Sequence, residues 1–335
     1  MKDLPLVLTL GEPAGVGLEI SLKACRELKG TIPFFVIGDF EQIKHFSLKF
    51  GVQITEIKDP SETLNHKNNF CVLDHKFPEK ISPGRISFKN SPSVISAIRR
   101  AVNLIHQEKA SGLITCPINK WVLKRGADFQ FPGHTEFLAK LDNKSGKVVM
   151  MLADNNSFRV IPTTIHIPLK HVPEMLTKEL LSSTLKTLVK GLQIDCGIFK
   201  PKILVTGLNP HAGENSTLGK EEQATIVPVI DELKRNGYSI TGPVSADTAF
   251  TSQNRSLYDA FVCMYHDQAL IPIKTLNFYE SVNVTLGLSF IRTSPDHGTA
   301  LDIATKNIAN PGSLISAIVE ANKIKKNRLK NENKA

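Results

Sequence analysis

Short apolar runs alternate with amphipathic segments through the first part of this 335-residue chain. The runs have the length of buried strands, and the segments between them have helical spacing. Strands are expected at residues 4–10, 34–37, 69–73 and 112–115, and helices at residues 18–28 and 93–107. This alternation predicts an α/β fold whose mostly parallel sheets are covered by helices.

The middle of the chain is richer in strands. These are expected at residues 148–152, 158–164, 202–208 and 260–265, with helices at 180–192 and 221–236, and the end is expected to be helical over 299–307 and 312–325. A chain of this length can form two domains. Because no linker is evident, the first domain is predicted to be discontinuous, comprising residues 1–140 and 285–335, with residues 141–284 forming the second.

Three histidines each follow one of these predicted strands. His166 lies in TIHIPL, His211 in LNPHAGE and His266 in MYHDQAL. The carboxyl ends of strands in open α/β sheets are where ligands bind. Three imidazoles can hold a divalent metal and leave coordination positions for substrate. A single histidine in this position is more often a solvated loop residue, so it is the repeated context that favours a metal site.

The net charge of +9 raises the possibility of a nucleic-acid partner. Much of it, however, lies in residues 323–335, which hold six basic side chains against one glutamate and no aromatic residue. We expect this segment to be a frayed, solvated end. The remaining positive charge suits an anionic small substrate equally well, so no nucleic-acid partner is expected.

The cysteines and the hydropathy indicate the compartment. The five cysteines are scattered, without a CxxC pair, which is typical of reduced thiols in a cytoplasmic protein. No apolar stretch approaches the ~18–20 residues that span a bilayer. The N-terminal apolar run ends in Gly-Glu-Pro, unlike a signal peptide. We therefore expect a cytoplasmic protein with no membrane partner.

Two glycine-containing turns could hold an anion. GEPAGVG, residues 11–17, lies between a predicted strand and helix, where a glycine backbone and a helix N-terminus can approach a ligand. It is neither the dinucleotide fingerprint nor a P-loop. SPDHGTALDIA, residues 294–304, could cradle a nucleotide. An ordinary tight turn explains GEPAGVG about as well as an anion site does. For SPDHGTALDIA the alternative is helix capping by Asp296 or Thr299.

Five polar side chains could bind an anionic substrate. FPGHTEFL places His134 and Thr135 at a predicted helix start, where they either cap the helix or point toward a ligand. Lys274, Asn283 and Arg292 follow His266 in one segment. Two cations and an amide can clamp a phosphate or carboxylate, although such cations are usually solvated surface residues.

Taken together, these motifs resemble those of one enzyme family. GEPAGVG, CPINK, FPGHTEF, VVMMLA, TIHIPL, LNPHAGE, MYHDQ, VNVTLGLSFIRTS and DHGTALDIA occur in one order over residues 6–320. The set resembles the 4-hydroxythreonine-4-phosphate dehydrogenases of the vitamin B6 pathway and, more distantly, isocitrate and isopropylmalate dehydrogenases. The resemblance implies a two-domain α/β/α fold of the isocitrate/isopropylmalate dehydrogenase-like type, with the active site in the interdomain cleft.

The resemblance also implies residue roles. His166, His211 and His266 match ligands of one divalent metal (zinc, magnesium or cobalt), shared between the subunits of a homodimer whose interface the second domain carries. The substrate-binding positions are matched by His134, Thr135, Lys274, Asn283 and Arg292. The loop implied to hold NAD or NADP contains His297, Gly298, Thr299 and Asp302. Asp247 and Asp267 are candidates for accepting a proton or for orienting a ligand.

The implied reaction is the oxidation of 4-phosphohydroxy-L-threonine to 2-amino-3-oxo-4-phosphooxybutanoate, which decarboxylates to 3-amino-2-oxopropyl phosphate. One alternative keeps this chemistry but uses a related four-carbon hydroxy acid, 4-phosphothreonate or 4-phosphoerythronate. A more distant alternative is an acyltransferase of the phosphate acetyltransferase type, which needs neither metal nor NAD. A non-enzymatic nucleic-acid binder is the third.

Overall fold

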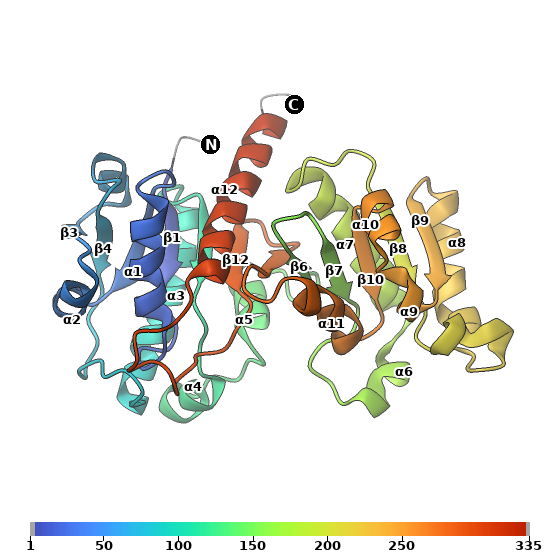
Figure 1. Cartoon of the computed structure of the whole chain (residues 1–335), viewed down its shortest axis with the longest axis horizontal. Helices are drawn as coiled ribbons and strands as arrows, with labels where there is room; N and C mark the ends of the chain where they lie inside the picture. Colours follow the sequence, from blue (N-terminus) through green and yellow to red (C-terminus); the bar gives the residue numbers. More distant parts are fainter. Residues whose placement is uncertain (1–3, 333–335) are drawn as a thin grey trace. The chain divides into compact units, whose positions relative to one another are not determined.

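The computed structural model describes residues 4–332 and divides into two compact α/β units (Figure 1). Unit 1 comprises the chain up to Ser145 and from Leu288 onward, and unit 2 comprises Gly146–Gly287. The sequence places these divisions at 140/141 and 284/285. Mostly parallel sheets with helices against them confirm the predicted α/β class.

Within the described part of unit 1, the strands form a parallel sheet in the order β3-β4-β2-β1-β5-β12. Their bounds are β1 Leu6–Thr9, β2 Phe34–Gly38, β3 Ile54–Ile57, β4 Phe70–Asp74, β5 Gly112–Thr115 and β12 Ile291–Pro295. The strands β1, β2 and β5 are buried throughout. Burial on both faces explains why these strands are continuous apolar runs in the sequence.

The helices of unit 1 cover both faces of this sheet. Their bounds are α1 Gly17–Leu28, α2 Phe40–Ser47, α3 Ser91–His106, α4 Lys120–Ala127, α5 His134–Leu141 and α12 Gly312–Glu332. α1 packs beside α12 in front of the sheet in Figure 1, whereas α3 packs against β1 and β5 behind it. The loops that follow β1, β5 and β12 therefore lie at one edge, because these strands are parallel neighbours.

In unit 2 the strand order among the described residues is β11-β6-β7-β10-β8-β9. The bounds are β6 Val149–Ala153, β7 Arg159–Pro162, β8 Lys202–Thr206, β9 Ser239–Val244, β10 Ala260–Cys263 and β11 Val282–Leu286. β7, β10, β8 and β9 are parallel, and β6 runs antiparallel to both of its neighbours. Phe158 and Phe261 pack edge to face in the core, with ring centroids 5.3 Å apart.

The helices of unit 2 are α6 Val172–Met175, α7 Lys178–Ile194, α8 Val227–Arg235, α9 Ala246–Ala249, α10 Ser252–Leu257 and α11 His266–Leu276. α7 packs against β6, β11 and α8, while α11 packs against β6, β7 and β10. No helix in residues 4–332 is both long and apolar enough to cross a membrane.

Two expectations about the C-terminal region are wrong. Residues 301–307 form turns instead of a helix, and Ala300 and Asn307 adopt positive φ values of 48° and 56° that an α-helix cannot continue through. The expected frayed end is also wrong for residues 323–332, which belong to α12. Ile324 and Lys325 are buried there, and Lys325 Nζ donates to the Leu4 carbonyl at 3.0 Å. Residues 333–335, with Lys334, lie outside the described residues.

Candidate active site

The strands that precede the three histidines are parallel neighbours in unit 2. β7, β10 and β8 are adjacent in the sheet, so His166, His266 and His211 follow the same edge. The side chains of His166 and His211 are exposed and that of His266 is half-buried. The order of the strands therefore places all three histidines along one edge of the sheet, which their separate positions in the sequence do not show.

His166 and His266 lie together. Their ring centroids are 5.6 Å apart with an interplanar angle of 42°, and both line a cavity of about 220 Å³ together with Thr164, Tyr265 and Asp267. His266 Nδ1 is hydrogen-bonded to Asp267 Oδ1 at 2.6 Å. A carboxylate on one ring nitrogen fixes the orientation of the imidazole and leaves Nε2 for a metal.

His211 lies in the loop after β8, beside Asp247. The hydroxyl of Ser245 lowers the pKa of Asp247, and the nearby His211 adds a smaller electrostatic contribution. Residues 4–332 contain no cluster of three or more His, Cys, Asp or Glu side chains close enough to hold a metal ion. This chain therefore brings together two of the three histidines. Two imidazoles in ring contact, one oriented by a carboxylate, fit the chemistry of a transition-metal ligand set.

The loop of His211 has an unusual backbone. Residues 211–216 all have positive φ values, from 40° to 78°, and only Gly213 among them is a glycine. A left-handed conformation costs roughly 1–2 kcal/mol for each residue that carries a β-carbon. Such strain persists only where the surrounding structure enforces it, and it is concentrated at functional sites.

Two buried side chains outside the predicted site residues hold these strand ends. Gln268 accepts hydrogen bonds from Thr206 Oγ1 at 2.8 Å and from Met264 N at 2.7 Å, and it donates to the Gly207 carbonyl at 2.9 Å. It thus joins the end of β8 to the end of β10. Glu222 accepts from the backbone at residues 208 and 209. A glutamine directly after His266 and Asp267 is the only sequence signal for this arrangement.

Unit 1 contains a buried cation at the matching edge of its own sheet. Arg292 on β12 is 4% exposed, and its Nη2 donates to Thr115 Oγ1 at the end of β5, at 2.9 Å. Burial lowers the pKa of the guanidinium to about 10, although the carboxylate of Glu136 acts in the opposite direction. A guanidinium removed from water in this way favours an anionic partner.

His134 complements this cation. It is the first residue of α5, which follows Gly133, so neither His134 nor Thr135 caps the helix. Its Nε2 is buried and makes no hydrogen bond to any of the described residues. Burial, together with the charge of Arg292, holds the pKa of His134 well below 6.5, so the ring is neutral at pH 7. A neutral ring with an unsatisfied buried nitrogen is suited to a hydrogen bond from or to a ligand.

The other two expected substrate residues belong to unit 2. Lys274 lies in the last turn of α11, with its Nζ 5.8 Å from the centroid of the Phe278 ring, and Asn283 lies on β11 opposite Leu152. Both side chains are half-buried.

The two glycine-containing loops of unit 1 contact each other. Val16 N donates to the Thr299 carbonyl at 3.1 Å, and a β-carbon on Gly15 would lie 2.7 Å from the same oxygen. His297 Nδ1 bonds to the Gly298 carbonyl at 2.8 Å, its Nε2 is buried without a described partner, and Asp302 is exposed. Close packing between the turn after β1 and residues 297–302 explains why the first turn needs a glycine.

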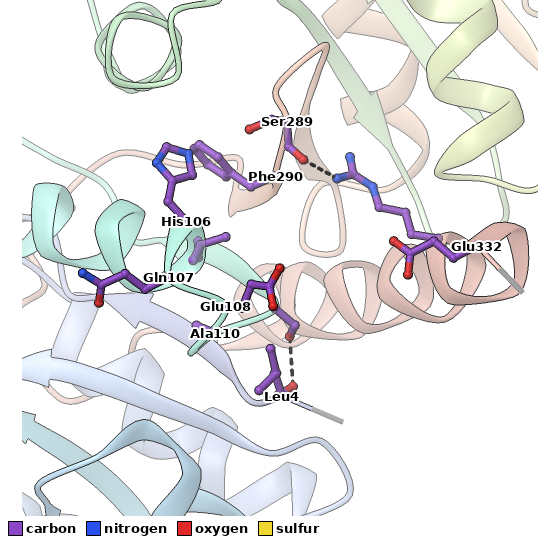
Figure 2. A pocket seen from close by; sticks show the side chains of 11 residues that line it. Leu4, His106, Gln107, Glu108, Ala110, Ser289, Phe290 and Glu332 are labelled. Atoms are coloured by element: carbon purple, nitrogen blue, oxygen red, sulfur yellow. Dashed lines mark hydrogen bonds between the residues drawn. The ribbon is translucent and has the colours of Figure 1, made fainter. Parts of the chain in front are cut away.

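A cavity of about 620 Å³ lies at the opposite edge of the unit 1 sheet, where β1, β5 and β12 begin (Figure 2). His106, Ser289, Phe290 and Arg328 contribute to its lining, and Arg328 donates to the Ser289 carbonyl at 3.0 Å. It contains none of the residues expected to bind substrate, cofactor or metal.

Comparison with known proteins identifies one family. A family model described as "Pyridoxal phosphate biosynthetic protein PdxA" matches residues 31–321. The 4-hydroxythreonine-4-phosphate dehydrogenase of Paracoccus denitrificans is 47% identical over 317 residues, which cover 94% of this chain and 95% of the relative. The 4-hydroxythreonine-4-phosphate dehydrogenase of Roseobacter denitrificans is 48% identical over 315 residues, which cover 94% of this chain and 95% of that relative.

A solved structure supports the same relationship. The crystal structure of 4-hydroxythreonine-4-phosphate dehydrogenase from Klebsiella pneumoniae superimposes with a TM-score of 0.85 at 33% sequence identity. The match covers 96% of this chain and 99% of that one.

Proposed function

This chain belongs to the PdxA family of pyridoxal phosphate biosynthetic proteins, and on that basis we propose that it oxidises 4-phosphohydroxy-L-threonine with NAD⁺ or NADP⁺. The product, 2-amino-3-oxo-4-phosphooxybutanoate, has a carbonyl β to its carboxylate and therefore loses CO₂ readily to give 3-amino-2-oxopropyl phosphate. The observation that carries the proposal is the buried Arg292 beside the half-buried His134, whose Nε2 is buried without a described partner, since this arrangement suits an anionic substrate.

We propose that five side chains bind the substrate. Arg292 and Lys274 offset the negative charge of the phosphate or carboxylate, and Asn283 adds an amide. His134 offers its unsatisfied Nε2, and Thr135 a hydroxyl, to polar groups of the substrate. Because His134 is neutral, it hydrogen-bonds to the substrate without adding a second charge beside Arg292.

His166, His211 and His266 would hold one divalent metal (zinc, magnesium or cobalt), which supplies a Lewis acid for alcohol oxidation when bound. Asp267 holds His266 in orientation through Nδ1. Asp247, exposed beside His211, is the candidate that accepts the hydroxyl proton of the substrate on a carboxylate oxygen.

The loop at residues 297–302 would bind the nicotinamide cofactor, which accepts the hydride when it is present. Its binding residues are His297, Gly298, Thr299 and Asp302. The packing of this loop on the turn after β1 supports the assignment, because that contact fixes the loop next to a glycine backbone and the start of α1.

A homodimer is part of the proposal. Most of the large apolar side chains that are exposed in residues 4–332 belong to unit 2, among them Ile271, Phe278 and Tyr279 of α11 and the segment after it. Exposed apolar surface of this kind favours association. The absence of a complete three-histidine cluster within the described residues of one chain supports a metal site that two subunits share. The free thiols of all five cysteines support a cytoplasmic location.

The test is a steady-state assay of NADH or NADPH formation by the purified dimer. We expect turnover of 4-phosphohydroxy-L-threonine to exceed that of 4-phosphothreonate and 4-phosphoerythronate, and to be lost after chelation and restored by added metal. Preference for either hydroxy acid would move the assignment to the related dehydrogenases. Activity that survives complete metal removal would refute the metal assignment.

A further inference from the structure

The left-handed turn at residues 211–216 begins with His211 itself (φ 53°, ψ 27°) and continues through Ala212, Glu214 and Asn215. Residues with a β-carbon do not hold this conformation in a run unless other groups enforce it. The direction in which His211 leaves the sheet edge therefore depends on whatever holds this turn.

The group at the base of the turn is the carboxylate of Glu222, in the π-helical segment Glu222–Ile226. Glu222 is 1% exposed. Its Oε1 accepts from Leu208 N and Asn209 N, both at 2.8 Å, and its Oε2 accepts from Asn209 Nδ2 at 3.0 Å. These donors belong to the residues that connect β8 to His211.

Two glycines make room for this carboxylate. A β-carbon on Gly213 would lie 2.4 Å from Glu222 Oε2, and one on Gly207 would lie 3.1 Å from Oε1. The carboxylate thus lies between the start of the loop and the left-handed turn, and it contacts both. A buried carboxylate that accepts several hydrogen bonds stabilises the donors in one geometry.

We propose that Glu222 is a positioning residue for His211: its buried carboxylate holds the left-handed turn in the conformation that presents the imidazole to the metal. The inference rests on the metal role proposed above for His211. Glu222 itself bonds to the backbone of the loop, and it acts on the metal only through the position of His211. Partners of this kind typically change metal affinity by about 10–100-fold when they are removed.

The experiment measures the dissociation constant of the purified dimer for Co²⁺, by competition with a chromophoric chelator. Glu222→Ala should weaken Co²⁺ binding about 10–100-fold. Glu222→Gln, which keeps an oxygen for the two backbone N–H groups, should recover most of that loss. The control is Glu221→Gln, because Glu221 also accepts from Asn209 Nδ2, at 2.8 Å, but bonds to neither residue 208 nor residue 209 through the backbone.

Amide hydrogen exchange of residues 208–217 provides the second measurement. Exchange there should accelerate in Glu222→Ala and stay at the wild-type rate in the control. If the alanine variant does not fold, Glu222→Asp, whose carboxylate is one methylene further from the loop, should show the same two effects in weaker form. Co²⁺ binding and exchange equal to wild type in the Ala or Asp variant would overturn this inference alone. Failure of the wild-type dimer to bind Co²⁺ would overturn the proposed function and this inference together.

Discussion

Replacement of Arg292 by methionine should weaken substrate binding without lowering the unfolding free energy of the protein. Arg292 is buried, and its pKa is lowered to about 10 because burial disfavours the charged form. At about 1.4 kcal/mol per pH unit, this depression corresponds to about 3 kcal/mol of unfavourable free energy for the charged group in the folded protein. The folded pKa lies below the unfolded one, so this penalty is fully present at pH 7 and is relieved only above pH 10.

Methionine removes the charge and keeps much of the volume, but it also loses the hydrogen bond to Thr115 Oγ1, which is worth roughly 1 kcal/mol. The net expectation is an unfolding free energy that is unchanged or raised by about 1–2 kcal/mol. The same variant should bind a phosphorylated substrate about 30- to 5,000-fold more weakly, since a buried charge partner is worth about 2–5 kcal/mol to its ligand.

The assay is urea denaturation at pH 7 without ligand, paired with the KM for substrate. Arg26→Met, at an exposed position on α1, is the matched control and should change neither quantity appreciably. A loss of more than about 2 kcal/mol of stability in Arg292→Met would show that the guanidinium is a structural ion partner. That result would refute the argument that its charge is kept for the substrate.

Three further predictions concern other buried groups. The pKa of His134 is held well below 6.5, so the wild-type protein should lose stability as pH falls below 6.5, by at most about 1.4 kcal/mol per pH unit. Denaturation of His134→Gln at pH 7 and pH 5 should show a smaller loss. An equal loss of unfolding free energy in the two proteins would contradict the prediction. Gln268→Glu replaces the donor to the Gly207 carbonyl by an acceptor and should lower the unfolding free energy by roughly 1–3 kcal/mol. An unchanged unfolding free energy would show that this hydrogen bond does not stabilise the fold. Ile324→Ala should lower the unfolding free energy by about 2–4 kcal/mol, because Ile324 is 1% exposed. Lys326→Ala, at an exposed position, is its control. If both variants lose equally little stability, the end of α12 is frayed.

The sequence predicted the features that depend on local pattern. Continuous apolar runs marked β1, β2 and β5, because parallel strands buried on both faces consist of such runs. The placement of His166, His211 and His266 after strands was also visible, since each follows an apolar run directly. That β7, β10 and β8 are neighbours was not visible, because strand order is set by the packing of the whole unit.

The remaining features depend on contacts between distant residues. β9 and β12 were missed because SITGPV contains Gly-Pro and IRTSP has few apolar residues, and both are strands through their pairing with β8 and β5. The sequence predicts a helix over residues 299–307 because their composition permits one, whereas residues 301–307 form turns. Neither the left-handed turn at His211 nor the buried bonds of Glu222 has a local sequence signature, since both arise from one loop folding onto a later helix.

The assignment of a metal to His166, His211 and His266 is tested most directly by anomalous scattering from crystals of the protein grown with Co²⁺ or Zn²⁺. The account predicts one anomalous peak for each chain, with imidazole nitrogens of all three histidines about 2.0–2.1 Å away if the ion is zinc. A peak bound by other residues, or no peak at these histidines in crystals that contain the metal, would contradict it.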